Sequence, residues 1–196
     1  ALSLTPQLGI GLAIWTLISV SLNEGAELFE ADRSLLLNST VDELSLVFRV
    51  IWRNTIIFLH NLPVVALALL LGDYKITWNI LLLIPLTMLV PVALIFPIAL
   101  FARLTLWRRD LKSFIPSVIQ VGFFLTPILW SPPTAGPMKV VFDINPVGWF
   151  IVLVKDAVLI NQIHWNLLLR CLIVVFGSLI LIELLQSQLR NVRKLI

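Results

Sequence analysis

The sequence predicts an all-α membrane protein, a polytopic helical bundle, from three observations. Apolar residues make up 59% of the 196 residues and charged residues 13%, whereas a typical soluble domain carries about 25% charge. Two apolar runs, 76–102 and 114–130, follow each other closely, and about 20 apolar residues let a helix cross the hydrocarbon core of a bilayer. The segment 103–112 between them is cationic, as expected for a turn held on the cytoplasmic side.

We expect about five spans, at 8–22, 44–71, 78–102, 114–130 and 167–185. The first is short and can continue as a helix into the acidic stretch that follows. Three of the runs contain prolines, namely Pro63, Pro85, Pro91, Pro97, Pro116 and Pro127. Membrane helices tolerate proline because neighbouring helices and local adjustments satisfy the freed carbonyl groups. Strands are not expected, because the runs are continuous and lack the alternating pattern of a barrel.

The basic residues set the orientation of these spans. With the 103–112 turn in the cytoplasm, ten basic residues lie inside and four lie outside, which favours this orientation over its inverse. The inner set is Arg33, Arg49, Arg53, Arg103, Arg108, Arg109, Lys112, Arg190, Arg193 and Lys194, and the outer set is Lys75, Lys139, Lys155 and Arg170. The C-terminus is then cytoplasmic and the first residue lies outside, so we expect an earlier span that is missing from this sequence.

The segment 23–43 is acidic and interrupts the apolar pattern. Glu24, Glu27 and Glu30 are spaced by three residues, so they share one side of a helix. Two interpretations stay open: a solvated cytoplasmic helix, which is the usual meaning of a charged run, or a short helix presented to a partner subunit.

The segment 131–163 also departs from a plain span. It opens with the cluster 132–137, whose prolines and glycine no helix can run through. A second break follows at Asn145-Pro146, and the apolar stretch 147–160 is too short to span comfortably. We therefore expect two short re-entrant helices that dip back into the outer leaflet, where irregular backbone is tolerated if protein covers it.

Several kinds of chemistry have no motif in this sequence. A phosphate-binding loop, a dinucleotide-binding glycine motif, a nucleophile elbow and a zinc-protease motif are all missing from it. His60 and His164 stand alone and are expected to be packing residues. Cys171 is the single cysteine, which excludes an intrachain disulfide framework. The net charge of +3 comes from residues that flank apolar runs, so it fits lipid headgroups better than nucleic acid.

Aromatic and polar side chains gather in and after the run 114–130. The aromatic set is Phe123, Phe124, Trp130, Phe142, Trp149, Phe150 and Trp165. These rings form either an interfacial belt or an exit whose flat apolar faces let a glycan slide. Gln120 and Thr126 are either packing contacts between helices or lining residues of a path. Arg103 and Asp110 are seven residues apart and can pair if the helix persists between them.

Taken together, these residues resemble a known family. The first part of the pattern is Ala102-Arg103, Arg108-Arg109-Asp110-Leu111-Lys112, Pro116, Gln120, Phe123-Phe124-Leu125-Thr126-Pro127-Ile128 and Asn145-Pro146. It resembles the ABC-2 type permeases that export polysaccharides such as O-antigen, capsule and teichoic acid. The second part is Gly25, Phe29, Leu37-Asn38, Phe48-Arg49-Val50-Ile51-Trp52-Arg53-Asn54 and His60-Asn61. It is similar to the lipopolysaccharide and O-antigen branch.

The resemblance implies a single transmembrane permease domain over 1–196 in a bacterial cytoplasmic (inner) membrane. Such a permease forms a homodimer with six spans per subunit, clamped by two separate ATP-binding cassette subunits. The implied substrate is a lipid-linked glycan. No cofactor is expected on this chain, because ATP and Mg belong to the partner subunit. Three departures are the missing N-terminal interface helix with the first span, Lys155 in place of a common arginine, and an acidic stretch at 24–32 that is heavier than the family pattern.

The resemblance also implies the roles of particular residues. A coupling helix is expected around 31–44, with the 108–112 turn as a lesser contact to the ATPase. The coupling residues are Asp32, Arg33, Asp42, Glu43, Arg108, Arg109 and Asp110. An outer gate is expected at 138–160 above a path lined partly by the run 114–130. The path and gate residues are Gln120, Phe123, Phe124, Thr126, Trp130, Asn145, Pro146, Trp149 and Phe150. No catalytic residue and no metal ligand are expected.

Transport is thus the leading hypothesis, with three alternatives open. A membrane-embedded enzyme acting on lipid-linked sugars needs a cluster of carboxylates or histidines, often with a metal, and the acids at 24–32 are its only candidate. A permease of the same superfamily for a drug or haem is the nearest rival within transport. A non-transporting scaffold or degenerate remnant is the third.

Overall fold

The computed structural model describes residues 4–38, 41–71, 78–133 and 135–189. Every regular element within these ranges is a helix, which confirms the all-α prediction. The elements are α1 Leu4–Ala31, α2 Arg33–Asn38, α3 Glu43–Leu71, the 3₁₀ helix η1 Trp78–Leu82, α4 Leu83–Thr87, α5 Leu89–Ala93, α6 Ile95–Trp107, α7 Leu111–Leu125, α8 Pro137–Ile144, α9 Pro146–Leu159 and α10 Trp165–Leu189.

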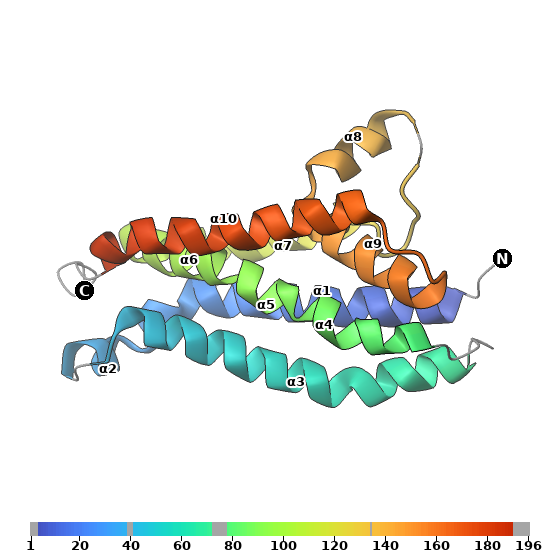
Figure 1. Ribbon diagram of the computed structural model, residues 1–196. Coiled ribbons are helices and arrows are strands. Elements are labelled where there is room, and N and C mark those ends of the chain that lie inside the picture. Colours follow the sequence, from blue (N-terminus) through green and yellow to red (C-terminus); the bar gives the residue numbers. More distant parts are fainter. Residues whose placement is uncertain (1–3, 39–40, 72–77, 134, 190–196) are drawn as a thin grey trace.

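Four helical stretches are long and apolar enough to cross a membrane. They are Pro6–Ala31, Glu43–Leu71, Trp78–Trp107 and Trp165–Leu185, and they confirm four of the predicted runs. The first also continues through the acidic stretch, as expected. The long helices lie lengthwise beside one another, and their connections alternate between the two ends of the bundle (Figure 1). We call the end that carries α2 and the turn between α6 and α7 the charged end, and the end near α8 and α9 the elbow end.

The predicted run 114–130 is wrong at its C-terminal boundary. The helix α7 ends at Leu125 rather than at Trp130. Its 15 residues extend over about 22 Å, short of the roughly 30 Å of a hydrocarbon core. The cause is Pro127: the residue before a proline is pushed out of the helical region, and Thr126 is extended, with φ −97° and ψ 137°.

The third long stretch, Trp78–Trp107, is built from short pieces rather than one regular helix. Its pieces join at Met88 and Leu94, which keep right-handed helical backbone, so the chain continues in one direction. Ser178 of α10 inserts at the second joint: its hydroxyl accepts from Phe96 N at 3.1 Å and donates to Val92 O at 3.4 Å. A neighbouring side chain thus satisfies backbone groups that the irregular helix leaves open.

The helices α8 and α9 confirm the two short helices predicted on either side of Asn145. They meet at an angle of 94°. The helix α8 projects from the bundle, whereas α9 lies between α10 and α1 (Figure 1). Most of α9 is buried, including the stretch from Phe150 to Lys155. Within the described residues, four helical stretches, or five if this bent pair is taken as one span, are long and apolar enough to cross a membrane.

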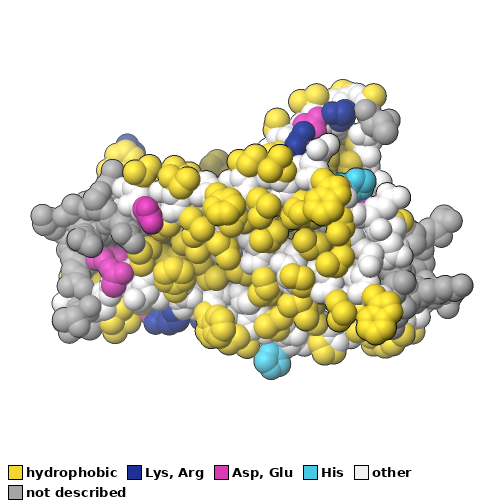
Figure 2. Space-filling model, in the orientation of Figure 1, with side chains coloured by type: hydrophobic (Ala, Val, Ile, Leu, Met, Phe, Trp, Pro, Cys, Tyr) yellow, Lys and Arg dark blue, Asp and Glu magenta, His cyan; other side chains and the backbone are white. Residues whose placement is uncertain are grey.

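The outer surface of the bundle is strongly apolar. Figure 2 shows hydrophobic side chains over the middle of the visible face and charged groups mainly toward its ends. Large side chains such as Trp52, Leu71 and Phe176 are 60–72% exposed. Exposed apolar patches of this extent are rare on soluble monomers. The described helices therefore have the surface of a multi-pass membrane protein.

Several expectations concern the helix ends. The predicted pairing of Arg103 with Asp110 required a continuous helix, but α6 ends at Trp107 and Arg108 is extended. The basic residues of the orientation count that lie outside the described residues are Lys75, Arg190, Arg193 and Lys194. Residues 39 and 40 of the expected coupling helix and Thr134 of the proline cluster also lie outside them.

Candidate functional site

The first part of the candidate site is a groove between α1 and α7. Its volume is about 370 Å³, and it is lined by Trp15, Ser19, Asn23, Pro116, Ile119, Gln120, Phe123 and Phe124. The ring of Trp15 meets Phe123 edge to face at 5.6 Å between centroids, and Phe123 meets Phe124 at 5.4 Å. Three aromatic rings and three side chains with hydrogen-bonding groups therefore share one groove. Such a lining can contact both the C–H faces and the hydroxyl groups of a sugar.

The groove brings together three of the predicted path residues, Gln120, Phe123 and Phe124. The contribution of α1 was missed from the sequence, because Trp15, Ser19 and Asn23 stand in or next to an ordinary apolar run. Their spacing of four residues places them on one face of a helix, which is the one signal that could have found them. The Oδ1 atom of Asn23 is buried and accepts no hydrogen bond within the described residues.

The second part of the site is the joint at Asn145, which ties α8 and α9 to the end of α7. Asn145 caps α9: its Oδ1 accepts from Gly148 N at 3.2 Å, and Pro146 occupies the first turn. Its Nδ2 donates to Leu125 O at 3.2 Å and to Thr126 Oγ1 at 3.0 Å. Thr126 in turn donates to Gly122 O at 2.7 Å. One side chain therefore fixes the bend against α7.

A group of charged and aromatic side chains fastens α8 to α10. The indole Nε1 of Trp149 donates to Phe142 O at 2.9 Å, and the guanidinium of Arg170 stacks at 5.2 Å from the centre of the Trp149 ring. Asp143 pairs with Arg170 at 3.2 Å and also with Lys139. The hydrogen bonds from Lys139 and then Arg170 hold the pKa of Asp143 below its usual value.

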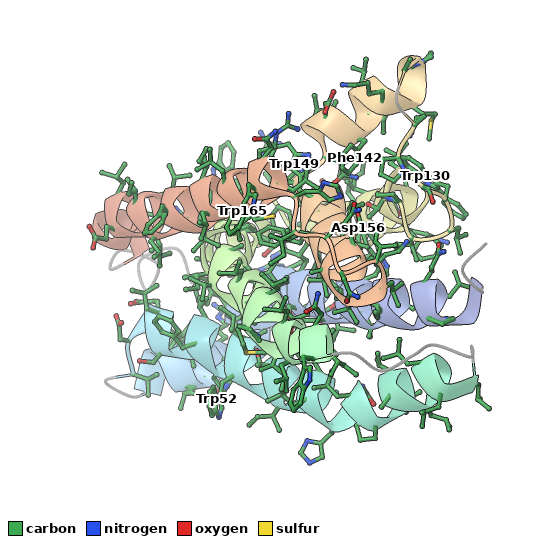
Figure 3. The ribbon with its side chains drawn as sticks, turned by 45° about the vertical axis from the view of Figure 1, so that its right-hand side comes forward. Trp52, Trp130, Phe142, Trp149, Asp156 and Trp165 are labelled. Atoms are coloured by element: carbon green, nitrogen blue, oxygen red, sulfur yellow. The ribbon has the colours of Figure 1, made fainter. Side chains whose placement is uncertain are left out.

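The third part of the site is an open pocket of about 650 Å³ beside the bend. Its lining includes Phe142, Asp156, His164 and Trp165, three of which are labelled in Figure 3 with Trp149 and Trp130 around them. His164 Nε2 lies 3.1 Å from Asp156 Oδ2, so the histidine expected to stand alone has a carboxylate partner.

The pairing of His164 with Asp156 follows from the loop after α9. Ile160 N and Gln162 N both donate to Asp156 O, at 3.1 and 3.2 Å, while Asn161 has a φ of +54°. This is a helix C-terminal cap with a residue in the left-handed region, a role that asparagine tolerates well. The chain turns back there, a conformation that the sequence did not predict.

The remaining predicted gate residues are packed within the chain. Phe150 is 3% exposed and Thr126 is 1% exposed. Trp130 Nε1 donates to Phe124 O at 3.3 Å, which places this ring beside the end of α7. Lys155 is buried and donates to Pro127 O at 3.3 Å. These side chains hold the joint between α7 and α9.

The charged end carries the predicted coupling residues. Arg33, Asp42, Arg108, Arg109 and Asp110 are exposed there, and the guanidinium of Arg108 stacks at 5.0 Å over Trp107. Two others differ: Glu43 is only 4% exposed, and Asp32 pairs with Arg49 of α3. A coupling helix was expected around 31–44. The structure has the six-residue helix α2 within that stretch.

The acidic face of α1 is matched by basic residues of this same chain. Arg53 lies 2.5 Å from Glu24, and Lys112 lies 3.8 Å from Glu27 and 3.3 Å from Glu30. Glu24 therefore connects α1 to α3, and the other two connect it to α7. The side chains of Glu27 and Glu30 nevertheless remain 58% and 50% exposed, so both interpretations of the stretch stay open. Within the described residues, no group of three or more metal-ligating side chains occurs.

No protein-family model matches this chain, and a search of curated proteins found no match. Fold and surface define its class as an all-helical protein with the apolar helices of a multi-pass membrane protein.

Proposed function

We propose that this chain is the transmembrane subunit of an ATP-driven exporter that moves a lipid-linked polysaccharide across the bacterial cytoplasmic membrane. In this proposal two copies form the permease, and two ATP-binding cassette subunits supply the energy. The chain itself contributes a path and a gate rather than catalysis.

The groove between α1 and α7 is the observation that carries the proposal. A glycan in transit needs surfaces that hold it weakly along its length. Aromatic faces supply contact with its apolar C–H groups, and side chains such as Ser19, Asn23 and Gln120 supply exchangeable hydrogen bonds. Polar groups placed on apolar helices face other helices or a cavity, and Ser19, Asn23 and Gln120 line this groove.

The bent pair of α8 and α9 is proposed as the re-entrant outer gate. It lies at the elbow end, and the joint at Asn145 connects it to α7, which lines the groove. A movement of α7 would therefore reach the gate through a short chain of direct contacts. Trp149 and Arg170 add a contact between this gate and α10.

The charged end is proposed as the contact surface for the ATP-binding subunit. Its exposed members Asp42, Arg108 and Arg109 can face a cytoplasmic partner. The ion pairs of Lys112 with Glu27 and Glu30 link the first turn of α7 to α1. A push on this turn would thus be transmitted to both walls of the groove.

Reconstitution with an ATP-binding subunit encoded beside this chain tests the proposal. We expect a lipid-linked glycan to stimulate ATP hydrolysis in proteoliposomes, and Gln120→Leu to lower that stimulation about tenfold, a loss of roughly 1.4 kcal/mol of interaction. The matched control is Val118→Leu, at an exposed position of α7 outside the groove. Equal stimulation in both variants would contradict the assignment of the groove.

The same assay separates the alternatives. Stimulation by a drug or by haem, but not by glycans, would favour the rival permease. Metal-dependent turnover of a lipid-linked sugar by the chain alone would favour the membrane-embedded enzyme. No stimulation by any substrate, with normal assembly, would favour the scaffold.

A further inference from the structure

The open pocket beside the bend lies between the proposed gate and α10. Three helices contribute to it: Phe142 comes from α8, Asp156 from α9 and Trp165 from α10 (Figure 3). Its volume of about 650 Å³ is within the range of small-molecule sites. The other lining residues are Pro132, Val152, Ile163, His164, Asn166 and Leu167. The pocket therefore combines apolar, aromatic and hydrogen-bonding side chains.

The hydrogen-bonding groups of this pocket are both held in place and accessible. Asp156 lies in the last turn of α9, and the carbonyl group of His164 accepts from Leu168 N at the start of α10. The two side chains meet at 3.1 Å, and they are 25% and 45% exposed. His164 Nε2 donates, because a carboxylate only accepts, and the two oxygens of Asp156 together offer about four acceptor positions. Asp156 can therefore also accept from a ligand, and the exposed amide of Asn166 offers a donor and an acceptor.

An exposed aromatic ring stands beside these groups. Trp165 is 72% exposed whereas Phe142 is buried, so Trp165 is the ring that a ligand can cover. A sugar residue has C–H faces that pack against an aromatic ring, and hydroxyl groups that donate to a carboxylate. An indole that serves only as an interfacial anchor needs no carboxylate and no amide next to it. The lining of this pocket thus matches the chemistry of a sugar residue.

We propose that this pocket binds one sugar residue of the exported glycan and selects residues that carry no acidic group. The inference rests on the proposed function, which supplies the glycan and places the elbow end outside. Trp165 stacks on the apolar face of the sugar, and Asp156 accepts from its hydroxyl groups. An acidic sugar would bring a second carboxylate next to Asp156, and like charges placed together disfavour binding. The pocket therefore discriminates against uronic acids.

Binding of four methyl glycosides to the full chain in phosphatidylcholine nanodiscs tests this inference. The probes are methyl glucoside, methyl galactoside, methyl glucuronoside and fully O-methylated methyl glucoside, and saturation-transfer NMR measures their dissociation constants at neutral pH. We expect one or both neutral glycosides with free hydroxyls to bind about tenfold more tightly than the charged probe and than the O-methylated probe, which has no donor. Equally tight binding of either control probe, or no binding of the two neutral glycosides, would overturn the proposal.

Tryptophan variants locate the site. Trp165→Ala is expected to lower binding of the neutral glycoside about tenfold, because the stacking face is lost. The matched control is Trp52→Ala, at a similarly exposed position (68%) outside the pocket, which should leave binding unchanged. Trp165→Phe keeps an aromatic face and should recover part of the loss. Equal effects of the two alanine variants would contradict the location.

Asp156→Asn tests the selection against acidic sugars. The amide carries no charge, so the preference for the neutral glycoside over the glucuronoside should disappear, and a preference that persists would contradict the role of Asp156. If this variant fails to fold, the preference of the unchanged chain still decides. Glycoside binding without glycan-stimulated ATP hydrolysis would contradict the proposed function alone, whereas stimulation without glycoside binding would contradict this pocket alone.

Discussion

At the scale of single residues, Asn145 connects α9 to the end of α7 at the elbow end. It caps α9 and donates to two oxygens at the end of α7. Its position after an apolar stretch and before Pro146 predicted a break between two helices, and the structure confirms that break. The sequence could not predict its hydrogen bonds to Leu125 and Thr126, which lie 19–20 residues earlier.

Replacing Asn145 with alanine should therefore destabilise the joint. Loss of the cap and of two hydrogen bonds is expected to cost about 1–3 kcal/mol, measured by thermal unfolding in detergent. Asn145→Asp keeps the cap oxygen and should recover part of the loss. An unchanged melting temperature for Asn145→Ala would contradict the role assigned to this side chain.

Asp143 gives the contact between α8 and α10 a pH dependence. Lys139 and Arg170 lower its pKa in the folded protein, below about 3.9 for an unperturbed aspartate. The stabilisation is thus fully present above the unfolded pKa and is lost as the pH falls through the lower, folded pKa. We expect amide-exchange protection of 137–144 to decrease in that window. In Asp143→Asn, the protection should be low both above and below this pH window. Equal pH profiles of protection in the variant and in the unchanged chain would contradict the account.

At the scale of elements, close approach of α1 and α6 depends on Gly25. A Cβ atom there would lie 3.0–3.1 Å from Ile98, closer than side chains normally pack. Gly25→Ala is expected to destabilise the protein by about 1–3 kcal/mol through overpacking, measured by thermal unfolding. Gly177→Ala is the matched control, because a Cβ there meets nothing within 4 Å. Equal effects at the two positions would argue against this packing.

The elements show what a sequence can predict and what it cannot. Runs of apolar residues predicted α1, α3 and α10, because length and hydropathy alone define a spanning helix. The end of α7 was misplaced, since hydropathy continues to Trp130 while Pro127 ends the helix at Leu125. The groove residues of α7 were predicted, but their partners Trp15, Ser19 and Asn23 required knowledge of which helices pack together.

At the scale of the whole molecule, charges separate between the two ends. The described basic residues at the charged end are Arg33, Arg49, Arg53, Arg103, Arg108, Arg109 and Lys112, whereas Lys139, Lys155 and Arg170 lie toward the elbow end. Under the positive-inside rule, this asymmetry predicts that the charged end faces the cytoplasm.

The same asymmetry predicts where an ATP-binding subunit acts. Arg109→Glu, at an exposed position of the charged end, should lower permease-stimulated ATP hydrolysis several-fold, because it reverses the charge of one side chain that contacts the ATP-binding subunit in the proposed complex. Ser131→Glu, at an exposed position of the elbow end, should leave that stimulation unchanged. The measurement is the ATPase rate in proteoliposomes that contain both subunits, and equal losses would contradict the assigned coupling surface.

Cysteine labelling of intact cells tests the membrane topology most directly. In a Cys171→Ala background, Lys139→Cys at the elbow end and Arg109→Cys at the charged end are each treated with a membrane-impermeant maleimide. We predict labelling of Lys139→Cys in intact cells, and labelling of Arg109→Cys only after the membrane is permeabilised. Labelling of both positions from the same side, or recovery of the protein without membranes, would contradict a chain that spans the bilayer with its charged end inside.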